Sequence, residues 1–274
     1  MVTGEDASDL VKDAARSAQR SPLLRRVARV GFVVLGVLHI LIGATAISIA
    51  LGSSASSADE GGAMEQIRRS AIGGLVLVIV AVSLVALAGW WIADAFLAGA
   101  SDGMRRWGRR IKNLGIAAVY LVLAGMAVVY AAGGRADPSQ NTQALGSLVL
   151  SAPGGEILLV AIGLGIVVVG GGFVVSAITR SFARELRVPT GTRRAGIEVF
   201  GVIGYLAKGI AVAVTGILFV TAAVTEDPHK AAGLDAALRG ILALPWGRLL
   251  LCAVGAGLVA YGLYCIARSG YERM

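Results

Sequence analysis

Three ionisable residues lie inside long apolar stretches of this 274-residue chain, and their types could support chemistry. Lys208 lies about ten positions into its stretch, which at about 1.5 Å of rise per residue is near the middle of a membrane. His39 lies at a similar depth in the first stretch, and Asp94 lies near the end of the second. A charge at this depth costs about 2.5 to 3.5 kcal/mol unless it is paired, snorkels or faces water. The three residues therefore predict either an intramembrane anion or proton site, or polar groups that hold neighbouring helices together.

The partners of these residues remain open from sequence alone. Asp94 can pair with Lys208 or with the arginines at 105 and 106, and the arginines are the simpler choice because they follow closely in the chain. Lys208 and His39 can approach each other if the segments that carry them are neighbours. A single intramembrane histidine is more often a hydrogen-bonded packing residue than part of a proton relay.

Motifs of catalysis and metal binding are absent from the sequence. It contains no Walker loop, His-Glu-x-x-His, Cys-x-x-Cys or nucleophile elbow. His39 and His229 are the two histidines, and they are expected at different depths, so they cannot share a metal ion. Cys252 and Cys265 lie thirteen residues apart on one predicted helix, too far apart to bond. We therefore expect no enzyme activity, no cofactor and no metal.

The composition predicts a membrane protein. Hydrophobic residues make up 56% of the chain and charged residues 15%, and the mean hydropathy is +0.77. A soluble domain and a disordered chain are both excluded by such values. The net charge of +8 does not indicate nucleic-acid binding, because the basic residues form short runs between apolar segments.

Six apolar runs are long enough to cross about 30 Å of hydrocarbon. The expected spans are Val30–Leu51, Ala71–Leu97, Asn113–Gly134, Ile157–Thr179, Val199–Thr225 and Leu249–Ala267. Between the spans of each pair, the stretches 59–70, 140–153 and 229–245 predict short helices that lie on the membrane surface. Trp246, at the last of these junctions, suits the interfacial aromatic belt.

The basic residues predict the orientation. Of the 25 lysines and arginines, 18 fall on the side that holds both termini, so both termini are expected in the cytoplasm. Two explanations fit the basic run on that side: it fixes the topology, or it binds anionic lipid headgroups. The residues of this run are Arg105, Arg106, Trp107, Arg109 and Arg110.

Glycine spacing indicates that one two-helix unit occurs three times. Three glycine pairs, each fifteen residues apart, mark the second span of each unit: Gly74 and Gly89, Gly155 and Gly170, and Gly247 and Gly262. Two glycine triplets with the same intervals mark the first spans of the outer units: Gly31, Gly36 and Gly43, and Gly204, Gly209 and Gly216. The middle unit has Asn113, Ala118 and Gly125 at these places. Such small residues are expected to be helix contacts.

The repeats predict the architecture. We expect an all-α membrane protein whose six transmembrane helices form three helical hairpins in a pseudo-threefold bundle. The expected division is a cytoplasmic N-terminal segment, 1–29, followed by repeats at 30–112, 113–198 and 199–274. Glu156 and Arg248 occupy equivalent positions just after aligned glycines, which suggests an ion pair between repeats.

The third repeat carries the clearest motifs. They are Gly-Tyr-Leu-Ala-Lys-Gly at 204–209, Gly-Leu-Asp-Ala-Ala-Leu-Arg at 233–239 and Pro-Trp-Gly-Arg-Leu-Leu at 245–250. With the triplicated unit, they resemble a family of three-repeat membrane proteins of unknown function that is common in actinobacteria. The first and second repeats lack the tyrosine and the lysine. The resemblance implies a six-helix protein of the bacterial inner membrane and implies no reaction.

Two functions from different classes remain. The first is a non-enzymatic accessory or scaffold subunit, which contacts the lipid bilayer and anionic lipids and binds another membrane protein or further copies of itself. The second is a channel or transporter for ions or small solutes, with Lys208 and His39 setting its charge preference near the middle of the membrane.

Overall fold

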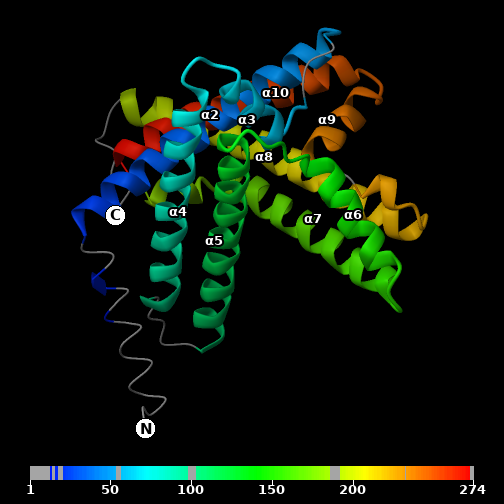
Figure 1. Cartoon of the computed structure of the whole chain (residues 1–274), viewed down its shortest axis with the longest axis horizontal. Coiled ribbons are helices and arrows are strands. Elements are labelled where there is room, and N and C mark those ends of the chain that lie inside the picture. Colours follow the sequence, from blue (N-terminus) through cyan, green and yellow to red (C-terminus); the bar gives the residue numbers. More distant parts are fainter. Residues whose placement is uncertain are drawn as a thin grey trace. The chain divides into compact units, whose positions relative to one another are not determined.

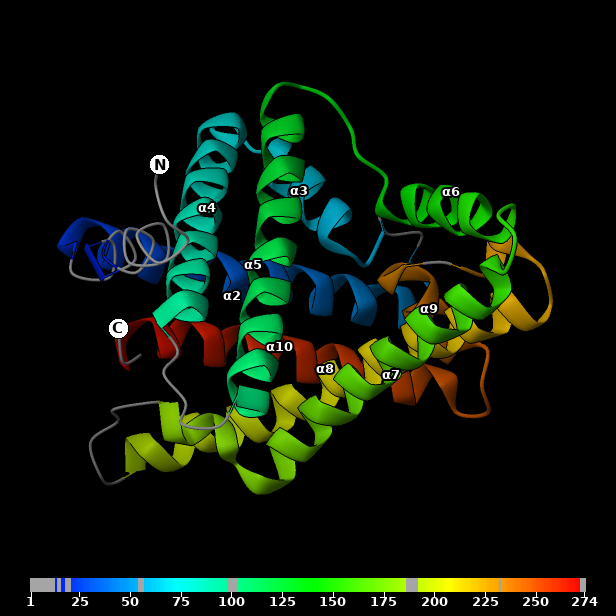
Figure 2. The ribbon, with the colours of Figure 1, turned by 90° about the horizontal axis from the view of Figure 1, so that it is seen from below.

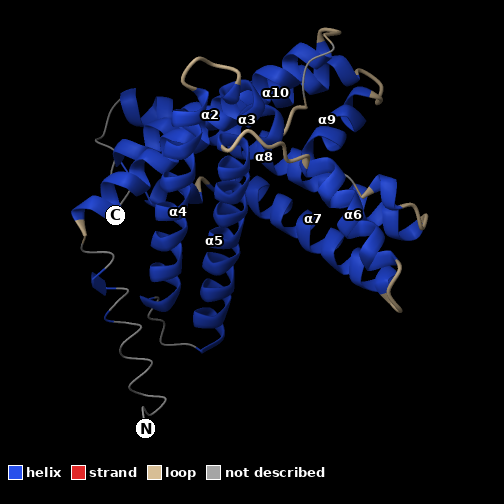
Figure 3. Cartoon of the chain, in the orientation of Figure 1, coloured by secondary structure: helices blue, strands red, loops and turns tan. Residues whose placement is uncertain are grey.

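The computed structural model is helical in every range that it describes, namely residues 13, 16–17, 21–53, 57–97, 103–185, 192–231 and 233–271 (Figure 3). Six of its helices are long and apolar enough to cross a membrane. They are α2 (Pro22–Ala50), α4 (Gly73–Leu97), α5 (Gly103–Ala131), α7 (Gly155–Thr179), α8 (Thr192–Val224) and α10 (Gly247–Tyr271). The predicted helical class and the six predicted spans are therefore confirmed.

Three of these helices begin well before the predicted spans. α5 begins ten residues earlier than expected, at Gly103, and α8 and α2 begin seven and eight residues earlier. The basic run that starts at Arg105 is therefore helical, whereas we had expected a connector. Arginine and lysine are good helix formers, and their long side chains can reach water from a helix that continues past the hydrocarbon.

Short helices occupy the connectors between the spans of each repeat, as predicted. They are α3 (Glu60–Arg68), α6 (Pro138–Leu150), the 3-10 helix η2 (Pro228–Lys230) and α9 (Leu234–Leu242). A further 3-10 helix, η1 (Ser181–Glu185), follows α7. Asp137 caps α6 by accepting hydrogen bonds from the backbone N–H groups of Ser139 and Gln140, and Pro138 fills the first helical position, where its missing N–H costs nothing.

The chain divides into two compact units, and α2 contributes to both. The described residues of the first unit are those up to 34 and those between 67 and 134, and its spans α4 and α5 lie side by side (Figures 1 and 2). The beginning of α2 packs on α4, where a Cβ added to Gly31 would lie 2.9 Å from the carbonyl oxygen of Ser83. A glycine is needed there because the two backbones are almost in contact.

The second unit comprises residues 35–66 and 135–273. Its spans are α7, α8, α10 and the later part of α2, and α8 contacts both α7 and α10. Glycines seven residues apart form the tightest contacts. The facing pairs are Gly209 with Gly170 and Gly216 with Gly163 between α8 and α7, and Gly36 with Gly262 and Gly43 with Gly255 between α2 and α10.

These glycine contacts repeat the same positions in two helix pairs. A Cβ added to Gly216 would lie 2.7 Å from the carbonyl oxygen of Gly163, and one added to Gly43 would lie 2.5 Å from that of Gly255. Of the glycines that make these contacts on α7 and α10, the spacing in the sequence identified Gly170 and Gly262 but not Gly163 and Gly255. In the first unit Gly31 has the predicted packing role, whereas a Cβ added to Gly74, Gly89 or Gly125 would meet nothing within 4 Å. The arrangement of all three hairpins around one axis stays a prediction.

Candidate intramembrane site

Lys208 and Tyr261 form the centre of the candidate site in the second unit. The Lys208 ammonium on α8 donates a hydrogen bond of 3.3 Å to the Tyr261 hydroxyl on α10. The same Nζ atom lies 4.3 Å from the centroid of the Tyr261 ring and 5.3 Å from that of Phe173 on α7. Both distances are within the range of cation–π attraction. Lys208 is therefore held by aromatic rings that belong to two neighbouring spans.

His39 on α2 contacts the same tyrosine. Its ring centroid lies 4.7 Å from that of Tyr261, with the two planes tilted by 59°. Its Nδ1 atom donates a hydrogen bond of 2.8 Å to the carbonyl oxygen of Leu35, one turn earlier in the helix. In the neutral form of the ring, this bond places the proton on Nδ1 and leaves Nε2 unprotonated. The structure thus brings Lys208 and His39 together through Tyr261.

The site continues into an aromatic cluster that reaches η1, the short helix after α7. The cluster consists of Phe173, Phe182, Tyr205, Tyr261 and Tyr264. Tyr205 stacks on Phe182 with ring centroids 4.9 Å apart and meets Tyr261 and Tyr264 edge to face at 5.4 and 5.6 Å. Such pairs add about 0.5 to 1.5 kcal/mol each beyond the area that they bury.

Small residues allow these rings to approach. A Cβ added to Gly204 would lie 2.5 Å from the Cα atom of Tyr261, and one added to Gly201 would overlap the Phe182 ring. Sequence reasoning missed the aromatic cluster. Its signal was the presence of Tyr205, Tyr261 and Tyr264 in the third repeat, the last two spaced three apart and so on one helix face.

Asp94 lies in the first unit and is held by a residue that sequence reasoning did not consider as its partner. Its Oδ2 atom accepts a hydrogen bond of 2.7 Å from the side-chain amide of Asn113, which links α4 to α5. Asn113 is 2% exposed. The simpler expectation, a pair with the arginines, is not seen for Arg106, which is exposed, and the side chain of Arg105 lies outside the described residues. Asn113, at the place of a glycine in the other repeats, thus joins two helices by a buried hydrogen bond.

The basic run forms the first turns of α5. Arg106 and Arg109 are exposed, and Trp107 is 61% exposed. The guanidinium carbon of Arg110 lies 5.9 Å from the centroid of the Trp107 ring, at the outer limit of a cation–π contact. This mixture of arginines and an exposed indole is typical of a membrane–water interface. Binding of anionic lipids by this run stays a prediction.

Glu156 and Arg248 lie in the first turns of α7 and α10 and are both exposed. Among the described residues of the second unit, ion pairs join Arg194 to Glu198 and Arg239 to Asp235, each at 2.8 Å. No bond between Glu156 and Arg248 is seen in this part of the chain, so the pairing of these two residues stays a prediction.

The connectors of all three repeats join in one assembly, here called the distal cap, formed by residue 58, α3, α6, η2 and α9. Asp235 on α9 accepts a hydrogen bond of 2.7 Å from the backbone N–H of Ala58 in the first repeat. A Cβ added to Gly61 on α3 would lie 2.7 Å from the Pro138 ring of the second repeat. Residues far apart in the sequence thus hold the three connectors together.

A buried carboxyl group lies inside the distal cap. Asp59 is 1% exposed, and its Oδ1 atom accepts a hydrogen bond of 2.8 Å from the backbone N–H of Gly62. Burial raises the pKa of Asp59 from 3.8 to about 6, and the nearby carboxylates of Glu60, Asp235 and Asp137 add to the increase, while the Gly62 N–H opposes it. The cap therefore contains a group that titrates near neutral pH.

The described residues include no group of three histidine, cysteine, aspartate or glutamate side chains that could hold a metal ion. Cys252 and Cys265 are not joined by a disulfide bond. The groups that the candidate site offers are therefore a lysine held over aromatic faces and an imidazole. This arrangement can stabilise helix contacts or attract an anion.

Comparisons with known proteins identify the family to which the chain belongs, and neither the family nor the relative has a described activity. The model of the family described as "Domain of Unknown Function (DUF1206)" matches the chain three times, at residues 30–98, 111–180 and 203–272. A relative from Bacillus subtilis (strain 168), "Uncharacterized protein YxxB", is 28% identical over 93% of this chain and 94% of its own length. No solved structure matches the chain. The predicted triplication is thus confirmed.

Proposed function

Because the chain belongs to the DUF1206 family and carries its unit three times, we propose that it is a non-enzymatic accessory or scaffold subunit of a membrane complex. It is a multi-pass membrane protein whose spans contact the lipid bilayer. The proposal places it in the bacterial inner membrane with both termini in the cytoplasm, and the excess of basic residues on that side supports this orientation.

One observation carries the proposal: Lys208 and His39 both contact Tyr261, which belongs to the same unit. Lys208 bonds to Tyr261 and lies over its ring, and His39 packs against that ring while bonding to its own helix. Through these contacts Tyr261 of α10 meets side chains of both α2 and α8. A protein that uses its intramembrane polar groups in this way is expected to act through its surface.

One face of α7 has no neighbour within the described part of the second unit, and this face supports the same proposal. Only 17% of the residues in the apolar part of α7 are buried. Its Gly163 and Gly170 face α8. Gly165 and Gly172 have the same spacing of seven, lie on the opposite face, and would meet nothing within 4 Å if given a Cβ. Glycines at this spacing allow helices to approach closely, so this face suits a helix of a partner protein.

The test is purification of the tagged full-length protein from its native membrane in mild detergent, with quantitative mass spectrometry of the proteins that co-elute. We expect one partner in stoichiometric amount, and we expect Gly172→Leu to remove it. Gly125→Leu, at an equally open glycine of the first unit, is the matched control and should retain the partner. A parent protein that elutes alone, or equal loss from both variants, would contradict the proposal.

A second proposal is a pathway for an anion or small solute. The observation that favours it is that the described contacts of the Lys208 ammonium are aromatic rings and a hydroxyl, which leave its positive charge unneutralised. Such a charge attracts anions near the middle of a membrane. Reconstituted protein should then carry an anion flux across liposomes that Lys208→Met abolishes. Liposomes that remain tight with the parent protein would exclude this pathway and leave the scaffold proposal untouched.

A further inference from the structure

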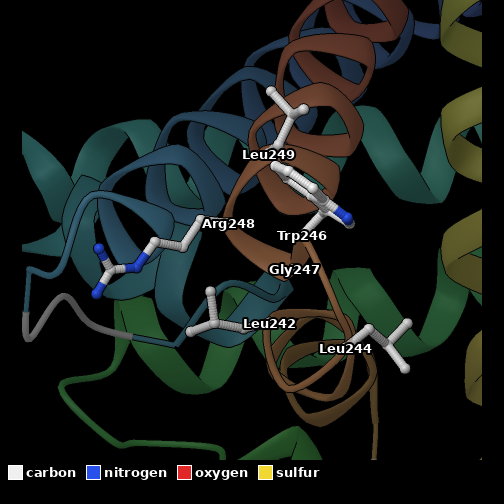
Figure 4. A pocket seen from close by; sticks show the side chains of 6 residues that line it. All are labelled: Leu242, Leu244, Trp246, Gly247, Arg248 and Leu249. Carbon is white, nitrogen blue, oxygen red and sulfur yellow. The ribbon is translucent and has the colours of Figure 1, made fainter.

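A hollow lies where α9 of the distal cap leads into the span α10 (Figure 4). Its lining residues are Leu242, Leu244, Trp246, Gly247, Arg248 and Leu249. Figure 4 shows the Trp246 ring beside Leu249, while Arg248 extends from the other side of Gly247 above Leu242. The hollow therefore combines a mainly apolar lining with one guanidinium group, at the level where a membrane span begins.

Trp246 has a backbone conformation that its side chain disfavours. Its φ is +61°, in the left-handed region, and its side chain is 82% exposed, so contacts within the described chain do not explain the tryptophan. The equivalent residue of the second repeat is Gly154, with a φ of +74° and no side chain to strain. The third repeat thus carries a strained, exposed indole at a place where glycine suffices.

The charge of the hollow also distinguishes the third repeat. Arg248 is the second residue of α10, and the equivalent second residue of α7 is Glu156. The second repeat therefore has a glycine and a carboxylate at the positions where the third has a tryptophan and a guanidinium. The junctions before α7 and α10 both have a proline followed by a residue in the left-handed conformation. The two junctions therefore differ in their side chains and not in their backbone.

We propose that this hollow binds one anionic phospholipid, with the lipid phosphate on Arg248 and its glycerol and upper acyl carbons against Trp246 and the leucines. A guanidinium group complements a phosphate in charge and geometry. Indole rings and leucines suit the boundary between headgroups and acyl chains. The site is separate from the basic run of α5, and it does not depend on the scaffold proposal.

The test uses Trp246 as the reporter of its own site. In the full-length chain with Trp90, Trp91 and Trp107 replaced by phenylalanine, Trp246 is the one remaining tryptophan. The protein is reconstituted in phosphatidylcholine vesicles that contain either brominated phosphatidylglycerol or brominated phosphatidylcholine, and quenching of the indole is measured. We expect phosphatidylglycerol to bind about fivefold more strongly, the ratio that corresponds to one arginine near a membrane surface.

Variants separate this site from general attraction of anionic lipid. Arg248→Gln should reduce the binding ratio to about one, and Arg248→Lys should retain most of the preference because it keeps the charge. Lys230→Gln removes another exposed cation of the distal cap and is the matched control, with no expected change. Arg248 is exposed, so these variants should fold, which size-exclusion chromatography verifies.

Three results would overturn the proposal. The first is equal quenching by the two brominated lipids in the parent protein. The second is an equal loss of preference in Lys230→Gln and Arg248→Gln, which would indicate diffuse attraction by the whole surface. The third is loss of the phosphatidylglycerol preference on addition of inorganic phosphate while the quenching itself remains, which would show that Arg248 binds a free phosphate and not the lipid headgroup.

Discussion

Replacing Asp59 by asparagine is expected to remove a pH-dependent loss of stability from the distal cap. Asp59 is 1% exposed and precedes α3, where it accepts the hydrogen bond of the Gly62 N–H. Asparagine caps a helix about as well as aspartate, so the variant keeps this bond and removes the charge. The change therefore isolates the cost of ionising a buried carboxyl group.

The direction follows from proton binding by the two states. Burial raises the pKa of Asp59 to about 6 in the folded protein, against 3.8 when it is unperturbed, so the folded state binds the proton more tightly. Stability is then greatest where both states are protonated, below about pH 4. It falls as the pH rises from about 4 to about 6 and stays low above that range. A shift of this size corresponds to about 3 kcal/mol at neutral and higher pH.

Hydrogen–deuterium exchange of α3 amides in the full-length protein measures this cost. Parent and variant are compared at the same pH, which cancels the intrinsic pH dependence of exchange. At pH 7.5 the α3 amides of Asp59→Asn should exchange up to about 100-fold more slowly than those of the parent, and at pH 4 the difference should shrink to about threefold. Asp227→Asn is the control, because Asp227 also caps a short helix but its side chain is 39% exposed.

Two outcomes would refute the reasoning. Faster exchange in Asp59→Asn at pH 7.5 would mean that the carboxylate is stabilised by its surroundings and not destabilised by burial. A difference between parent and variant that does not vary with pH would mean that the effect comes from the shape of the side chain and not from its proton.

Three further predictions concern the spans and use the free energy of unfolding in detergent. Gly209→Val should lower stability by about 1 to 3 kcal/mol, because its Cβ would lie 2.8 Å from a carbonyl oxygen of α7. Gly171→Val, in open space, is the control and should change stability little. Equal effects of the two substitutions would contradict the packing argument. Lys208→Met should raise stability by about 1 kcal/mol, because the cost of the intramembrane charge exceeds the cation–π attraction that is lost; a clear decrease would show that the charge is well compensated. Asn113→Leu should lower stability by about 1 to 3 kcal/mol by leaving Asp94 without its donor, and Asn113→Leu combined with Asp94→Leu should recover most of the loss.

The sequence alone determined the elements of the fold. Hydropathy located all six spans, because a segment that crosses the hydrocarbon must itself be apolar along about 20 residues and must satisfy its own backbone hydrogen bonds. The glycine intervals identified the triplicated unit, because equivalent helices need small residues at equivalent depths. The beginnings of α2, α5 and α8 were misplaced, because a helix continues beyond the hydrocarbon when its terminal residues are basic and can reach water.

Only the tertiary structure decided which side chains meet. Lys208 and His39 were recognised as unusual from the sequence, but their common partner Tyr261 was not, since it lies 53 residues from Lys208 and on another helix. Asn113 as the donor to Asp94, and the burial of Asp59 in the distal cap, were equally hidden. Composition fixes the depth of a residue in the membrane, whereas its partner depends on the rotation of each helix and on which helices are neighbours, and both are set by packing among distant segments.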